Sequence, residues 1–184
     1  MTEQEIVDTL KIRLKDKLRQ SEISPYESKA FPCVTESLVR EAEAKLGYVL
    51  PPLLSRIWIE VANGGTGPGY GLYGLDGGLP DEGTELTIPE LCLHYRELSY
   101  WEEIVGESLS QTTFPICDWG CRITSILDCS TPAGKIFLLS ESGLLVDQNA
   151  SFAEWIEDWL IGKPVGSESY KRASGVVSEN AARA

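Results

Sequence analysis

Apolar residues recur at helical spacing in three stretches of the N-terminal half. Within residues 3–19, an apolar residue stands at every fourth position, with charged residues in between: Ile6, Leu10, Leu14 and Leu18. A second helix is predicted from Thr35, whose hydroxyl can cap its first turn, to Gly47, which adopts a left-handed end cheaply. Its predicted buried face consists of Leu38, Val39, Ala42 and Leu46. A third begins at Pro51 and Pro52, where a missing N–H is tolerated, and buries Leu54, Ile57, Trp58 and Val61.

The rest of the chain predicts a sheet followed by a last helix. Glycines crowd the stretch from Asn63 to Gly78, and residues 70–75 within it predict a short strand. Helical segments are expected over residues 88–99 and 100–105. Three β-rich runs then predict an antiparallel meander: 114–117, 122–128 and 135–140. Ser151 is expected to cap a helix over 152–161, with Phe152, Trp155, Ile156 and Trp159 facing inward.

This order of elements, with helices first, a sheet in the middle and a helix last, predicts an α+β fold. The length of 184 residues fits one domain, which we expect over residues 1–164. Residues 165–184 are mostly small or charged and predict a flexible tail.

Composition narrows the class of protein. The chain is 42% hydrophobic and 24% charged, which excludes a disordered chain, a collagen and a coiled coil. No apolar run approaches the roughly 20 residues that cross a bilayer. The first twenty residues are charged throughout and lack the apolar stretch of a signal peptide. We therefore expect a cytoplasmic protein with no membrane segment.

Negative charge is concentrated in one part of the chain. The net charge is −12, and residues 76–107 alone contain nine acidic residues and a single basic one, Arg96. Such a chain should repel nucleic acid, whose binders cluster Lys and Arg, and should attract a basic partner. The alternative interpretation is that these acidic residues form a solvated face that serves only solubility.

The sequence offers little catalytic or cofactor chemistry. Five cysteines without an export signal indicate free thiols, and no second close pair accompanies Cys117 and Cys121 to hold a metal. The glycine stretch 64–78 contains no Lys or Arg, which argues against a nucleotide site. His94 is the only histidine, and no nucleophile motif accompanies it as a catalytic base would require. We expect no cofactor and no metal.

Large aromatic residues fall in or beside predicted loops, where such rings often anchor interfaces. Taken alone, each of them is more typical of a core residue than of a contact residue. Together with the acidic residues they suggest a binding surface, for which the predicted set is Tyr70, Tyr73, Asp76, Glu97, Trp101, Glu102, Glu103, Asp118 and Trp119.

The run Leu46-Gly47-Tyr48-Val49-Leu50-Pro51, followed by an apolar helix and Asn63-Gly64-Gly65, resembles the SMI1/KNR4 family of the SUKH superfamily. Pro115-Ile116, Trp119-Gly120 and Leu127-Asp128 look like the central strands of that family, and residues 150–156 look like its closing helix. The similarity covers about residues 33–162. Its structural positions are Gly47, Pro51, Asn63, Gly64, Gly65, Gly120 and Asp128.

The resemblance implies an α+β fold with a mixed or antiparallel sheet packed by helices, and it implies no shared active site. Many bacterial members of the family are immunity proteins that neutralise toxins, often nucleases or deaminases, whereas fungal members are interaction proteins of cell-wall synthesis and signalling. The acidic segment 76–107 is not part of the family pattern. The expectation is therefore a non-enzymatic protein that binds a basic toxin, of unspecified oligomeric state. The alternatives are a scaffold without a toxin partner and an enzyme that uses His94.

Overall fold

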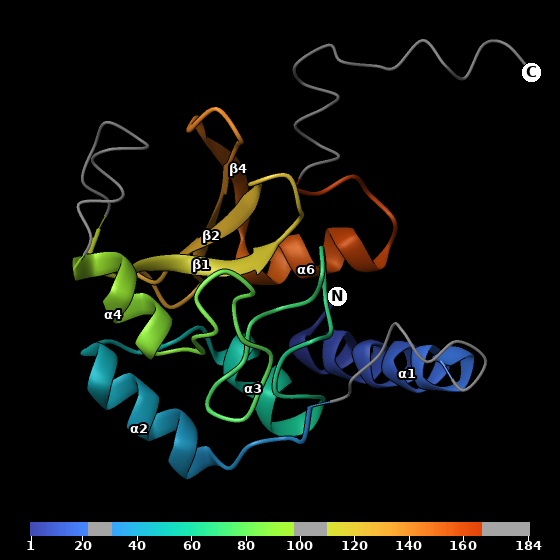
Figure 1. Cartoon of the computed structure of the whole chain (residues 1–184). Coiled ribbons are helices and arrows are strands. Elements are labelled where there is room, and N and C mark those ends of the chain that lie inside the picture. The colour runs from blue at the N-terminus through green and yellow to red at the C-terminus, as the bar shows by residue number, and fades with distance from the viewer. Residues whose placement is uncertain (22–30, 98–109, 167–184) are drawn as a thin grey trace, which may run out of the picture.

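The computed structural model describes residues 1–21, 31–97 and 110–166 (Figure 1). The helices are α1 (Glu3–Ser21), α2 (Glu36–Leu46), α3 (Pro52–Glu60), α4 (Glu90–Glu97) and α6 (Phe152–Leu160). The strands are β1 (Thr113–Asp118), β2 (Thr124–Asp128), β3 (Lys135–Leu139) and β4 (Leu145–Ser151). The α+β prediction is confirmed. Among the described helices, none combines the length and the apolar character needed to cross a bilayer.

The four strands form one antiparallel sheet in the order β1-β2-β3-β4. The predicted meander is confirmed for its first three strands, and β4 adds a strand that was not predicted. The predicted strand over 70–75 is wrong, because only Leu72 forms a bridge, to Cys117 of β1. Gly71, with φ of +103°, interrupts the extended backbone next to that bridge.

Local signals set the helix ends as predicted. Thr35 Oγ1 accepts a hydrogen bond from the amide of Leu38, and Gly47 ends α2 in the left-handed conformation. Ser151 caps α6 in a reciprocal capping box with Glu154. The predicted helix over 88–99 is shorter at its start, because Ile88 and Pro89 form a turn before α4. Its end at residue 99 and the segment 100–105 lie outside the described residues.

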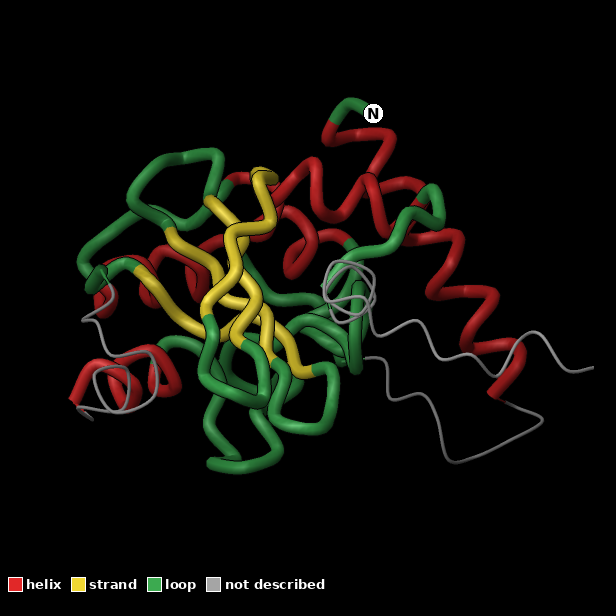
Figure 2. The backbone as a smooth tube through the Cα atoms, turned by 90° about the horizontal axis from the view of Figure 1, so that it is seen from above, coloured by secondary structure: helices red, strands yellow, loops and turns green. Residues whose placement is uncertain are grey.

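One main apolar cluster joins the helices to one face of the sheet, with Trp58 and Trp155 fully buried in it. Figures 1 and 2 show α4 beside one end of the central sheet and α1 toward the other end. Val165, which belongs to the predicted tail, packs into this cluster, and Gly166 is also buried. The packed chain therefore reaches residue 166, and the rest of the predicted tail lies outside the described residues.

Candidate functional site

A groove with a volume of about 430 Å³ runs between α2 and residues 75–90. Its floor is apolar and consists of the half-buried Leu38 and Leu86 together with the buried Ala42, Leu75, Ile88 and Pro89. Its rim is exposed and charged, with four carboxylates and one ammonium group: Glu41, Asp76, Glu85, Glu90 and Lys45. The groove therefore combines an apolar floor with an acidic rim.

Asn63 holds one wall of this groove in place. Its side chain is buried, and its Nδ2 donates to the carbonyl oxygens of Leu75 at 3.2 Å and Asp76 at 3.1 Å. Its Oδ1 accepts from the amide of Leu75 at 2.8 Å. A Cβ added at Gly78 would lie 2.3 Å from the carbonyl oxygen of Asn63, so only glycine permits this close approach. The asparagine predicted as part of a backbone corner thus also positions Asp76.

Tyr73 and Asp81 fix the next turn of the same segment. The Tyr73 hydroxyl donates to Oδ1 of Asp81 at 2.9 Å, while Oδ2 of Asp81 accepts from the amide and the hydroxyl of Thr84, both at 2.9 Å. Burial, together with the neighbouring carboxylate of Asp81, raises the pKa of Tyr73. Tyr73 is only 3% exposed, so the expectation that it anchors a partner is corrected: it supports the fold from inside.

Most of the negative charge on the rim is uncompensated. Lys45 Nζ lies 3.0 Å from Oε1 of Glu90. Within the described part of the chain, Glu41, Asp76 and Glu85 form no ion pair. Some carboxylates elsewhere on the surface have cationic partners, namely Glu60, Asp147 and Asp158, whereas others, such as Glu82 and Glu141, have none among the described residues. What distinguishes the groove is that three carboxylates that the described residues leave without a cationic partner line a single hollow.

A second cluster forms where residues 69–70 meet the β1–β2 turn. The amide of Tyr70 donates to the carbonyl oxygen of Asp118 at 2.9 Å. Oδ1 of Asp118 accepts from the amide of Gly120 at 2.7 Å, and Trp119 Nε1 donates to the hydroxyl of Ser125 at 2.8 Å. Tyr70 is 62% exposed, whereas Trp119 is half-buried. The structure therefore brings Tyr70, Asp118 and Trp119 together, while Asp76 lies in the groove, which other segments form.

The remaining predicted contact residues are not tested. Trp101, Glu102 and Glu103 lie outside the described residues, as does the side chain of Glu97 at the end of α4.

The residues expected to be structural occupy turns, a helix start and a hydrogen-bonded strand end. Gly64, Gly65 and Gly120 have positive φ, Pro51 precedes α3, and Asp128 accepts hydrogen bonds from Thr112 and Ser130.

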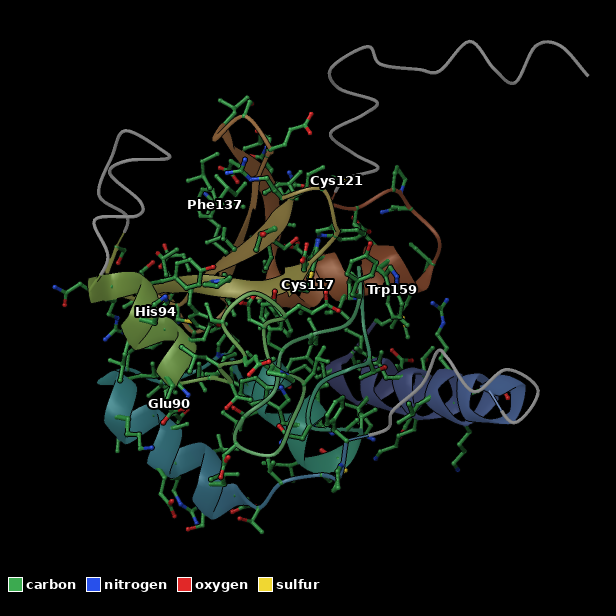
Figure 3. All side chains as sticks on the ribbon, in the orientation of Figure 1. Glu90, His94, Cys117, Cys121, Phe137 and Trp159 are labelled. Carbon is green, nitrogen blue, oxygen red and sulfur yellow. The ribbon has the colours of Figure 1, made fainter. Side chains whose placement is uncertain are left out.

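His94 is half-buried on α4, with its ring edge-on to that of Tyr95 at 5.8 Å between centroids. Figure 3 shows it on the same helix as Glu90, away from the labelled Cys117 and Cys121.

Three cysteines are buried. Burial raises the pKa of the Cys117 thiol to about 12 and also raises the pKa of Cys92 and Cys129. Among the residues the structure describes, no group of three or more His, Cys, Asp or Glu side chains could hold a metal ion.

The groove was only partly predicted. Asp76, Glu85 and Glu90 belong to the acidic segment recognised in the sequence, but Glu41 and Lys45 of α2 were not linked to them. Their spacing of four places both on the polar face of the predicted helix. That signal was available, but it does not identify which segment packs opposite.

No protein-family model, no curated protein and no solved structure matches this chain. The resemblance to the SMI1/KNR4 family therefore depends on the sequence motifs themselves.

Proposed function

We propose that this protein is a non-enzymatic binding protein of the SMI1/KNR4 immunity type, which neutralises a basic toxin by covering its active cleft. The observation that carries this proposal is the acidic groove, where three rim carboxylates have no cationic partner among the described residues. A nuclease-type toxin displays Lys and Arg because its cleft must hold phosphates. Such a surface is the electrostatic complement of this groove.

The mechanism is electrostatic steering followed by steric occlusion. The negative field of the groove and of the acidic segment attracts a basic surface and raises the association rate. Salt weakens this attraction, since the screening length is about 8 Å at physiological ionic strength. Once docked, a folded domain of this size keeps the large nucleic-acid substrate out of the toxin cleft.

A second candidate function is that of a scaffold or regulatory module without a toxin partner. The cluster around the exposed Tyr70 favours it, because this second surface is built from other segments than the groove. A scaffold would use both surfaces for different partners. An immunity protein would depend on one dominant contact patch.

Co-expression with the toxin domains encoded beside the gene tests the proposal. We expect one basic domain to become non-toxic and to co-purify with this protein in a complex that high salt weakens. If no neighbouring domain is neutralised and several unrelated proteins are bound instead, the scaffold is the better account. Glu141→Gln is a matched control, because Glu141 is an exposed carboxylate in the β3–β4 turn and not part of the groove.

A further inference from the structure

We infer that the groove between α2 and residues 75–90 is a pocket for one arginine side chain of a protein partner. This inference rests on the proposed function, because it specifies which group of a basic partner the protein holds. Two features of the groove carry it, namely an apolar floor and a rim whose carboxylates lack a cation.

The floor suits the aliphatic part of a long side chain. Leu38 and Leu86 line the groove and are half-buried, so part of each side chain is accessible, whereas Ala42, Leu75 and Ile88 are buried. Long cationic side chains cover apolar surface with their methylene groups while the charged head stays near water. A short polar residue would leave this floor uncovered, and an uncharged apolar residue would bring no cation to the acidic rim.

The rim favours a guanidinium head group. Asp76 and Glu85 on one wall and Glu41 on α2 offer carboxylate oxygens from two sides. A guanidinium has five N–H donors in a planar fork, so it can bind two carboxylates at once, whereas an ammonium acts as a compact and strongly hydrated point charge. Arginine is also enriched among the residues that dominate interface energies.

Lys45 limits where that head group can lie. Its ammonium already pairs with Glu90 at 3.0 Å, so this end of the groove is neutralised by the chain itself. A guanidinium is therefore directed toward the Asp76 and Glu85 wall. Removing the Lys45 charge should free Glu90 and strengthen the binding of a cation.

The walls are held before any partner arrives. Asn63 fixes the backbone at Leu75 and Asp76, and Asp81 fixes the turn that precedes Glu85. A site held by its own hydrogen bonds loses little conformational entropy on binding, which favours affinity. The groove thus needs no rearrangement of its backbone to accept a side chain.

The test uses the full chain and a peptide probe, acetyl-Gly-Arg-Gly-amide, followed by amide chemical shifts at low salt. The control peptide replaces arginine with citrulline, which keeps the shape and removes the charge. We expect the arginine peptide alone to shift amides near residues 38–45 and 75–90. Equal shifts with both peptides, or shifts spread over all acidic surfaces, would overturn the assignment.

Variants then locate the contact. Combining Asp76→Asn with Glu85→Gln should weaken binding of the arginine peptide about three- to tenfold, as expected for two exposed ion pairs. Glu141→Gln should leave the affinity unchanged, and Lys45→Gln should raise it. An affinity that the double variant does not alter would contradict the pocket, provided its unfolding midpoint matches that of the wild type.

The two proposals can fail separately. If a neutralised toxin binds the Asp76 and Glu85 double variant as tightly as the wild type, the pocket is wrong and the immunity function stands. If the arginine peptide binds in the groove but no toxin domain is neutralised, the pocket stands and the proposed function is wrong.

Discussion

Replacing Asn63 with alanine should both destabilise the fold and loosen the groove. The wild-type side chain is 2% exposed and makes three hydrogen bonds to the backbone of residues 75 and 76. The backbone groups that lose their partner differ in how much they depend on Asn63. The cost can therefore be worked out group by group.

The amide of Leu75 is the group most affected. Among the described residues its only acceptor is Asn63 Oδ1, so this buried N–H would be left without a partner. Such a loss costs about 1–3 kcal/mol. The carbonyl oxygen of Leu75 keeps a second donor, the amide of Gly78 at 2.7 Å. The carbonyl oxygen of Asp76 lies in an exposed turn and can accept a hydrogen bond from water instead. With the small cavity added, we expect a loss of about 2–4 kcal/mol in unfolding free energy.

Urea unfolding measures this loss. Tryptophan fluorescence is a suitable reporter, because two of the five tryptophans, Trp58 and Trp155, are fully buried in the folded chain. The midpoint of Asn63→Ala should fall while the slope of the transition stays unchanged. Gln111→Ala, which removes an exposed amide side chain, is the control and should change stability by less than about 0.5 kcal/mol. A loss below about 1 kcal/mol for Asn63→Ala would refute the reasoning, since an orphaned buried N–H costs at least that much.

Three further predictions concern stability. Gly64→Ala should lower the unfolding free energy by about 2–4 kcal/mol, because the positive φ is strained and the new Cβ would lie 2.7 Å from the carbonyl oxygen of Leu72. Gly77→Ala, whose Cβ would meet no atom within 4 Å, should lower it by only about 1–2 kcal/mol from the strain alone. Equal losses in urea unfolding would contradict the role of the contact with Leu72. Ser151→Ala should cost about 1 kcal/mol by removing the capping box of α6, and an unchanged thermal midpoint would show that the cap contributes nothing. The pKa of Tyr73 is raised in the folded state, so only the unfolded chain loses this proton just above the ordinary value of 10.0, and stability should fall as pH rises through that range. Urea midpoints from about pH 8 to about pH 11 should therefore decline less steeply for Tyr73→Phe than for the wild type, and parallel declines would refute this role.

Helix boundaries could be predicted from the sequence because each depends on residues close together in the chain. Thr35 and Ser151 bond to amides three residues later, and Gly47 needs only its own backbone freedom. Such short-range interactions are the same in a peptide and in a folded domain. Gly47 and Pro51 of the predicted motif are of this kind, whereas Asn63 and Gly64 also contact residues 72–79, which the motif does not indicate.

Strand β4 and the burial of Tyr73 could not be predicted in this way. The β4 sequence, LVDQNAS, has no alternation of apolar and polar residues, and its side chains are mostly half-buried. Its place in the sheet comes from pairing with β3. Tyr73 was assigned to a loop surface, but its burial depends on Asp81 and on β1, whose Ile116 accepts a hydrogen bond from the Tyr73 amide.

The groove depends on contacts between segments far apart in the chain. Residues 38–45 and 75–90 are joined across the groove only after the fold has formed, and Asn63 fixes the second of these segments from a third position. Within the described part of the acidic segment, Asp76, Glu82, Glu85 and Glu90 are exposed. Which of these carboxylates would stand together, and which would gain a partner such as Lys45, requires the tertiary structure.

The most direct test of the account is the association rate between this protein and a neutralised toxin domain, measured at low and at high salt. The wild type should associate quickly at low salt and much more slowly at high salt. The double variant with Asp76→Asn and Glu85→Gln should associate more slowly at low salt and respond less to added salt. An association rate that neither salt nor this variant changes would contradict the claim that the acidic groove recognises a basic partner.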